Sequence, residues 1–262
     1  MPLSTPRIVE LARRLESAAL ERRTERKLTD AEPDFTLSDG YEVQWALRNL
    51  RITAGARLSG LKMGLTSRAK MKQMGVDSPI YGFLLDEFYV PADSQIAMSG
   101  LIHPRVEPEI ALVTNRDLRG PGCTIANALA AIDFAVPAME IIDSRYTDFK
   151  FDLPSVVADN GSSARYVVGT TARRVRDLDL RTLGVVVEKN GEAVSFGAGA
   201  AVLGHPVSSL AMLANLLALR EQIIPAGTYV MTGGITEAIK AQAGDHFVAR
   251  FQDLGSLSTR FV

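Results

Sequence analysis

The chain has 262 residues, of which 47% are hydrophobic and 23% are charged, and its formal net charge is −1. This size suits one large domain, or one domain with a smaller appendage, and the composition is ordinary for a globular enzyme. The near-neutral charge argues against a nucleic-acid or membrane-surface partner. A single cysteine, Cys123, excludes an intrachain disulfide. No signal-peptide pattern and no apolar run of membrane-spanning length is evident, so we expect a cytoplasmic protein.

Two segments with helical periodicity open the chain. Apolar residues recur at helical spacing over residues 4–28, and Pro6 suits a first helical turn. The stretch from Thr36 to Asp39 offers capping side chains ahead of a second apolar segment that contains Trp45. We therefore expect a helical N-terminal unit of about 55 residues that docks on the rest of the chain, with Trp45 packed at the contact.

A glycine-flanked apolar run follows over residues 58–67 and is expected to be a short strand. Lys62 lies within it. A lysine in such a run either extends to the surface or lies near a buried anion, and the local pattern leaves both open. Residues 68–74 are expected to form a short helix that ends at Gly75.

From about residue 76, short strands alternate with turn signals. The pair Asn190-Gly191 between two apolar runs predicts a β-hairpin, and further strands are expected over residues 229–234 and 247–251. Helices are expected over residues 126–133 and 208–219. Strands with two inserted helices predict a mixed α+β body and not a regular βαβ alternation.

Two glutamates of a predicted strand are the candidates for metal chemistry. Glu107 and Glu109 stand two residues apart, so their side chains share one face of the strand. Burial of neighbouring carboxylates is costly without a compensating cation, and magnesium and manganese favour oxygen ligands. Glu140, at the end of a second apolar run, is a natural third ligand. The spacing alone is common, however, and by itself favours a solvated strand face.

Two further stretches have open interpretations. The segment Asp159–Ser163 and the segment Thr232-Gly-Gly are rich in short polar groups and glycine. Each is either a plain turn or a set of hydroxyl and backbone N–H groups that bind a substrate carboxylate. No dinucleotide-binding or phosphate-binding loop motif accompanies them.

The order of the motifs along the chain carries more information than any one of them. In sequence they are Leu61-Lys-Met-Gly-Leu-Thr-Ser67, Pro79-Ile-Tyr-Gly-Phe83, Val106-Glu-Pro-Glu-Ile110, Met139-Glu-Ile-Ile-Asp-Ser-Arg145, Val157-Ala-Asp-Asn-Gly-Ser-Ser163, Leu203-Gly-His-Pro206 and Met231-Thr-Gly-Gly234. Over nearly the whole chain this set resembles the 2-oxopent-4-enoate hydratase and 4-oxalocrotonate decarboxylase family, within the fumarylacetoacetate hydrolase-like superfamily.

The resemblance implies a small helical N-terminal part, residues 1–75 with a lid-like short helix, packed on a mixed β-roll catalytic domain, residues 76–262. It implies a magnesium site, with manganese as a second possibility, at Glu107, Glu109 and Glu140. Lys62 would be the catalytic lysine, which stabilises charge on the substrate or shuttles a proton. The substrate-binding residues would be Lys62, Ile80, Leu84, Ser162, Thr232 and Gly233.

One position separates the two branches of this family. Hydratases of this family have a motif similar to Pro-Asp-Phe-Gly at the position where this chain has Pro79-Ile80-Tyr81-Gly82. Hydration needs an acid–base group, which Ile80 lacks, whereas an apolar wall that includes Leu84 suits loss of a carboxylate. The resemblance therefore implies a carboxy-lyase that converts 2-oxohex-3-enedioate, a small dicarboxylate 2-oxo acid, to 2-hydroxypenta-2,4-dienoate in meta-cleavage breakdown of aromatic compounds.

The alternatives are a hydratase of 2-hydroxypentadienoate and a non-catalytic subunit. A homo-oligomer and a complex with the pathway hydratase are also expected.

Overall fold

The computed structural model describes residues 2–68, 71–72, 76 and 78–262. The helix expected over residues 68–74, with its lid-like role, lies largely outside the described residues. The described α-helices are α1 (Thr5–Glu21), α2 (Leu28–Ala31), α3 (Leu37–Thr53), α5 (Ile125–Ala130), α6 (Leu153–Ala158) and α7 (Pro206–Ala218). Single-turn 3₁₀ helices are η1 (Asp86–Phe88), η2 (Met98–Gly100), η3 (Thr147–Phe149), η4 (Asn160–Ser162), η5 (Val175–Asp177) and η6 (Gly199–Ala201).

The strands of the described part of the chain form two sheets. They are β1 (Leu58–Gly64), β2 (Ile80–Leu85), β3 (Tyr89–Pro91), β4 (Ser94–Ile96), β5 (Arg105–Thr114), β6 (Ile132–Ile142), β7 (Ser163–Val168), β8 (Arg173–Arg174), β9 (Gly184–Lys189), β10 (Glu192–Ala198), β11 (Tyr229–Met231), β12 (Ile239–Lys240), β13 (His246–Phe251) and β14 (Gly255–Phe261). The nine-stranded sheet runs β2-β1-β11-β5-β6-β7-β3, with β12 on β5 and β8 on β6. The five-stranded sheet runs β10-β9-β13-β14-β4.

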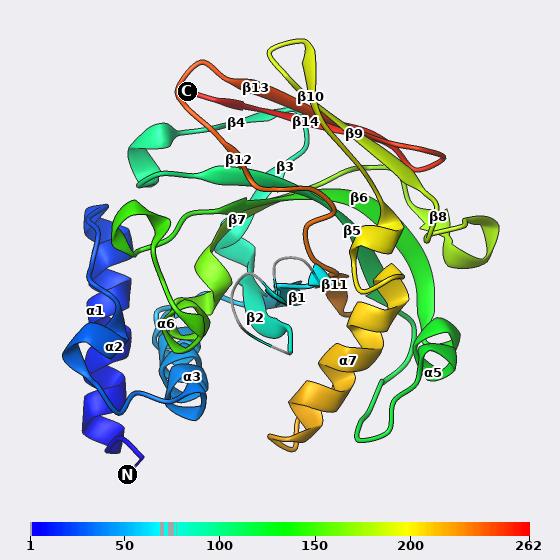
Figure 1. Ribbon diagram of the computed structural model, residues 1–262. Helices are drawn as coiled ribbons and strands as arrows, with labels where there is room; N and C mark the ends of the chain where they lie inside the picture. Colours follow the sequence, from blue (N-terminus) through cyan, green and yellow to red (C-terminus); the bar gives the residue numbers. More distant parts are fainter. Residues whose placement is uncertain (1, 69–70, 73–75, 77) are drawn as a thin grey trace.

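The long strands β5 and β6 lie between two layers (Figure 1). On one side, their side chains join those of the five-stranded sheet and of α7 in one hydrophobic core. On the other side, residues of the nine-stranded sheet pack against α1 and α3 in a second cluster. The expected α+β fold, with N-terminal helices on a mixed sheet, is confirmed. The boundary at residue 75 stays a prediction, and β1, on its N-terminal side, pairs with β2 and β11 inside the main sheet.

Two expected helices end earlier than their sequence patterns suggested. The helix expected over residues 4–28 stops at Glu21, because Arg22 adopts a left-handed conformation and Arg23 N–H bonds back to the Ala18 carbonyl at 3.0 Å. The helix expected over residues 126–133 stops at Ala130. Ile132 instead opens β6 and pairs with Thr114, so long-range strand pairing overrides local helix preference there.

Other expected elements are confirmed. The strands β9 and β10 form the predicted hairpin, and Asn190 and Gly191 both have positive φ, as a two-residue turn of this kind requires. The helix expected over residues 208–219 is α7. One expectation from the sequence is wrong: the stretch Gly199–Ala218, with a mean hydropathy of 1.5, is long and apolar enough to cross a membrane by length and composition. Half of this stretch is buried in the fold, as is common for a core helix.

A buried capping box fixes the start of α3. Thr36 accepts a hydrogen bond from the Asp39 backbone, and the Asp39 carboxylate accepts from the Thr36 backbone at 3.0 Å and the Thr36 hydroxyl at 2.6 Å. Asp39 also accepts from the Leu3 backbone at 3.1 Å, which ties the segment before α1 to α3. Burial alone would raise the pKa of Asp39, but these hydrogen bonds outweigh it and hold the pKa below its usual range.

We predict that Asp39→Ala lowers the free energy of unfolding at pH 7 by about 1–3 kcal/mol, because three donors lose their acceptor. Since the pKa of Asp39 is lower in the folded chain, the carboxylate stabilises the fold above about pH 4 and that contribution is lost on further acidification. Urea denaturation at pH 7 and pH 3 measures both effects. The control, Asp30→Ala in α2, removes a more exposed carboxylate and should change stability by less than about 0.5 kcal/mol. An Asp39→Ala cost that is the same at both pH values contradicts the assignment.

Candidate metal and substrate site

The side chains of strand β5 alternate between two faces of the sheet, with core residues on one face and acidic residues on the other. Val106, Ile110 and Leu112 face the core between the two sheets. The intervening residues Glu107 and Glu109 face the opposite side, and both are buried. The acidic pair is therefore not a solvated strand face, the interpretation that spacing alone favoured.

Glu140 joins this pair across the ladder between β5 and β6. It lies directly opposite Glu107 in the strand register. One carboxylate oxygen from each of Glu107, Glu109 and Glu140 can be chosen so that all three lie within 4.8 Å of one another. The sequence expectation that these three side chains converge is confirmed by this geometry.

Lys62, from β1, extends to the same cluster. Its Nζ forms an ion pair with Oε2 of Glu140 at 2.7 Å, and it donates to the Gly161 carbonyl at 3.2 Å. The side chains of Lys62 and Glu140 are 3% and 1% exposed, so this contact is shielded from water. Of the two possibilities that the sequence left open, the structure selects the lysine beside a buried anion.

The electrostatics of the cluster fit a divalent cation. Burial, followed by the nearby carboxylate of Glu140, raises the pKa of Glu109 well above its usual range, while Lys62 opposes this shift. Burial also raises the pKa of Glu140, again against the opposing effect of Lys62. The Oε1 atoms of Glu109 and Glu140 are buried and accept no hydrogen bond from any described residue. Oxygen atoms in this state are the donor set that magnesium or manganese binds.

Two glycines after β11 allow the backbone to approach the acids closely. Gly233 has φ of 113°, and its N–H donates to Oε2 of Glu109 at 2.7 Å. At Gly234, a Cβ atom would lie 2.9 Å from the carboxyl carbon of Glu107. The predicted substrate contact of Gly233 stays a prediction, and the observed role of its N–H is to orient a carboxylate.

A cavity of about 690 Å³ opens beside the acids, large enough for a small organic acid. Its lining includes Lys62, Glu107, Ile80 and Ser162. Leu84 and Thr232 are not among the described residues that line it. Leu84 is fully buried beneath the N-terminal helices, and the Thr232 hydroxyl donates to the Ile110 carbonyl at 2.7 Å. Substrate contact by these two residues stays a prediction that the geometry does not favour.

Sequence reasoning missed several residues that line this cavity. Arg105 lies two residues before Glu107, and its guanidinium carbon is 4.1 Å from the centre of the Phe149 ring. Lys27 and Lys150 add positive charge to the lining. The period of two along β5 could have identified Arg105, because it places residues 105, 107 and 109 on one face. No local pattern indicates the other three, since the fold brings them in from two distant segments, one at the start of α2 and one between β6 and α6.

The comparisons with known proteins agree with this geometry. Residues 62–262 match the model of the fumarylacetoacetate (FAA) hydrolase C-terminal family. The chain belongs to the fumarylacetoacetate hydrolase family. The matched span holds each of the converging side chains of the site, from Lys62 to the glycines after β11.

Within the fumarylacetoacetate hydrolase family, the relatives include decarboxylases and hydratases. The chain is 55% identical over 260 residues to a 4-oxalocrotonate decarboxylase of Pseudomonas putida, covering 99% of this chain and 98% of that one. A solved structure of 4-oxalocrotonate decarboxylase from Pseudomonas putida G7, complexed with magnesium and adipate, matches with a TM-score of 0.98 at 53% identity and 99% coverage of both chains. A 2-hydroxypent-2,4-dienoate hydratase of Pseudomonas putida is 41% identical over 211 residues, 80% of this chain and 95% of that one.

We predict that Gly234→Ala weakens magnesium affinity by roughly 10- to 100-fold, because the added methyl group must displace the Glu107 carboxylate. Gly234 lacks a positive φ, so the backbone tolerates alanine and the melting temperature should change little. Isothermal titration with magnesium chloride measures the affinity. Gly184→Ala is the control, since its Cβ would meet Gln252 only at an ordinary 3.6 Å. Equal magnesium affinity in the two variants contradicts the prediction.

Proposed function

We propose that this protein is a magnesium-dependent carboxy-lyase that converts 2-oxohex-3-enedioate to 2-hydroxypenta-2,4-dienoate. The observation that carries the proposal is the buried cluster of three carboxylates beside Lys62, one of which, Glu107, lines a cavity that is also lined by apolar side chains. The 55% identity to a 4-oxalocrotonate decarboxylase over nearly the full length supports the same reaction.

Glu107, Glu109 and Glu140 would hold the metal ion, with manganese as an alternative to magnesium. When bound, the ion supplies Lewis acidity that stabilises negative charge on the 2-oxo oxygen of the substrate. The protein's own part is to keep the three carboxylates together. The pairing of β5 with β6 places them side by side, and the Gly233 N–H orients Glu109.

Lys62 supplies a fixed positive charge next to the reacting atoms. In the substrate, the bond to the distal carboxylate is conjugated through the 3,4-double bond to the 2-oxo group, so the electron pair that it releases moves to the 2-oxo oxygen. An ammonium group held in a dry site stabilises that charge more strongly than it would in water. Ser162, which is buried and lines the cavity, would orient a substrate carboxylate.

The apolar wall of the cavity favours decarboxylation over hydration. Ile80 is 3% exposed and packs with Val156, and the partly buried Phe151 lies against them. All three line the cavity. A carboxylate placed against such a wall loses hydration, which favours its departure as uncharged carbon dioxide. Addition of water needs a proton-transfer group at this place, and Ile80 provides none.

A hydratase of 2-hydroxypentadienoate is the second candidate, supported by the 41% identity to a relative with that name. Assays with both substrates and magnesium separate the two activities. We further propose a homo-oligomer, a complex with the pathway hydratase, and a cytoplasmic location. Activity of the purified chain alone would exclude the remaining possibility of a non-catalytic subunit of such a complex.

We predict that the wild-type chain releases carbon dioxide from 2-oxohex-3-enedioate with magnesium and loses this activity when the metal is removed with EDTA. Glu107→Gln and Glu109→Gln should each lose magnesium-dependent turnover, because a neutral amide is a poor ligand for a hard cation. Circular dichroism should show that both variants remain folded. Unchanged turnover in either variant would contradict the assignment of these glutamates as metal ligands.

We also predict that Ile80→Asp lowers the decarboxylation rate, because a buried carboxylate repels the one that must depart and keeps water in the cavity. Ile80→Val, which preserves the apolar wall, is the control and should stay within about threefold of wild type. Thermal melts identify any loss of fold, and Ile80→Asn tests polarity without charge. Wild-type rates in folded Ile80→Asp and Ile80→Asn would refute the role of Ile80.

A further inference from the structure

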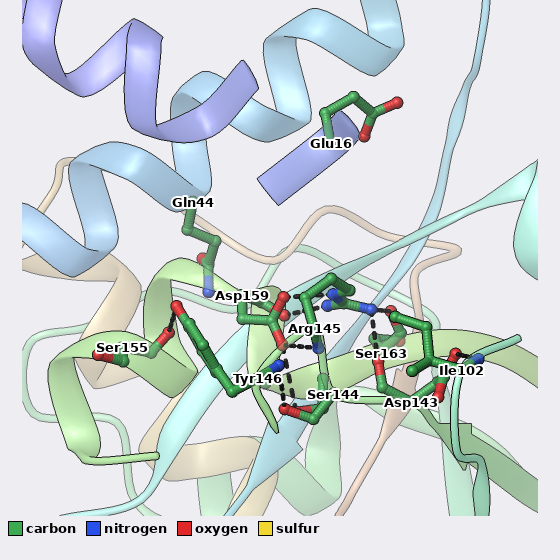
Figure 2. A network of polar contacts seen from close by, with 12 residues as sticks. Glu16, Gln44, Ile102, Asp143, Ser144, Arg145, Tyr146, Ser155, Asp159 and Ser163 are labelled. Carbon is green, nitrogen blue, oxygen red and sulfur yellow. Dashed lines mark hydrogen bonds and ion pairs between the residues drawn. The ribbon is translucent and has the colours of Figure 1, made fainter. Parts of the chain in front are cut away.

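A network of polar contacts lies where the chain leaves β6 (Figure 2). Its centre is the segment Asp143–Arg145, three residues after Glu140. Asp143 accepts hydrogen bonds from the backbone N–H groups of Ile102 and His103, each at 2.7 Å, and so holds the segment that leads into β5. The site described above uses none of these residues.

The Arg145 guanidinium binds four acceptors at once. It forms a buried ion pair with the Asp159 carboxylate and donates to the carbonyl groups of Asp159, Asp143 (2.8 Å) and Ser163 (3.2 Å). Its backbone N–H also donates to Asp159 Oδ2 at 3.2 Å. Figure 2 shows Arg145 lying between Asp159 and Ser163. A planar group with donors in a fixed fork can hold several acceptors in one relative arrangement, which a lysine cannot.

The segment held in this way, residues 159–163, has a backbone that needs outside support. Asn160, Gly161 and Ser162 all have positive φ, between 51° and 62°. For residues other than glycine this conformation is costly and persists only where the surroundings impose it. Asn160 exchanges two hydrogen bonds with the Phe83 backbone, at 2.9 and 3.0 Å, so β2 holds the segment from the opposite side.

This segment meets the site at two points. The Gly161 carbonyl accepts the hydrogen bond from Lys62 Nζ at 3.2 Å, and Ser162 lines the cavity. The Ser162 carbonyl in turn accepts from the Asp143 backbone N–H at 2.7 Å. The direction of the Lys62 ammonium therefore depends on where the 159–163 segment lies.

We propose that Arg145 is a positioning residue for this reaction. By holding the 159–163 segment, it fixes the Gly161 carbonyl that directs Lys62 and the position of Ser162, which lines the cavity and whose hydroxyl donates to Oδ2 of Asp159 at 3.4 Å. This inference rests on the proposed function for its kinetic consequence, whereas the contacts of Arg145 do not depend on that function.

The test uses two variants of the full chain. Arg145→Lys keeps a cation beside Asp159 but cannot bind the three carbonyl groups. Arg145→Met combined with Asp159→Leu removes both charges, so no buried charge is left without a partner and the fold has its best chance to survive. We expect the value of kcat to fall roughly 10- to 100-fold in both, because small displacements of catalytic groups cost this much. The KM value and the magnesium Kd should stay within about threefold, since the contacts of Arg145 in the described structure include none of the three glutamates.

Hydrogen exchange followed by mass spectrometry provides a readout apart from activity. Faster exchange should appear in peptides that contain residues 159–163. The matched control is Arg51→Lys, which alters a partly buried arginine that is bound to Glu16 and Glu87 at 2.7 Å each. Within the described part of the chain, Arg51 forms no hydrogen bond or ion pair with the 159–163 segment. We expect this control to lose stability without a fall in kcat.

Three results would overturn the proposal. The first is a kcat within twofold of wild type in both Arg145 variants. The second is a fall in kcat that Arg51→Lys reproduces at equal loss of melting temperature. The third is unchanged exchange at residues 159–163. A wild-type chain that releases no carbon dioxide would contradict the proposed function instead, and the exchange measurement would still judge the contacts of Arg145.

Discussion

The burial of three carboxylates at one point is the constraint on which the rest of this structure depends. Glu107, Glu109 and Glu140 carry like charges out of water, and such a cluster is unfavourable unless cations and hydrogen-bond donors are brought to it. The fold brings Lys62 from β1 and the Gly233 N–H from the turn after β11. Within the described part of the chain, Oε1 of Glu109 and Oε1 of Glu140 accept no hydrogen bond, and they mark the place that would suit a divalent ion.

The architecture explains how such a cluster can exist in the middle of a sheet. Strand β5 is covered on both faces, and its side chains point alternately to one face and the other. One face belongs to the core between the two sheets, and the other face lies on the side of the sheet that packs against the N-terminal helices. The acids lie on that second face, and one of them, Glu107, lines the cavity. Stability and chemistry therefore use opposite sides of the same ten residues.

The residues that line the cavity depend on other residues to hold them in place. Groups that touch the cavity, such as Ser162 and Gly161, lie on a segment whose left-handed backbone does not hold itself in place. Asp143 and Arg145 follow Glu140 where the chain leaves β6. Together they connect the 159–163 segment to the residues before β5. One turn of the chain thus joins the supports of the acids and of the lysine, which is why we assign it a functional role.

From the sequence we could predict the α+β class, the hairpin at Asn190-Gly191, the capped helix after Thr36 and, through the order of the motifs, the convergence of Glu107, Glu109 and Glu140. Alternation, turn chemistry and capping are local properties of the chain, and the motif order identifies a family. Tertiary contacts were needed to show that Lys62 meets Glu140 and that Ile132 belongs to β6 and not to a helix. They were also needed to show that Arg105 and Phe149 line the cavity, whereas Leu84 and Thr232 are not among the described residues that do. Each of these depends on which distant strands and loops pack together, and packing between distant segments leaves no periodic signal in the chain.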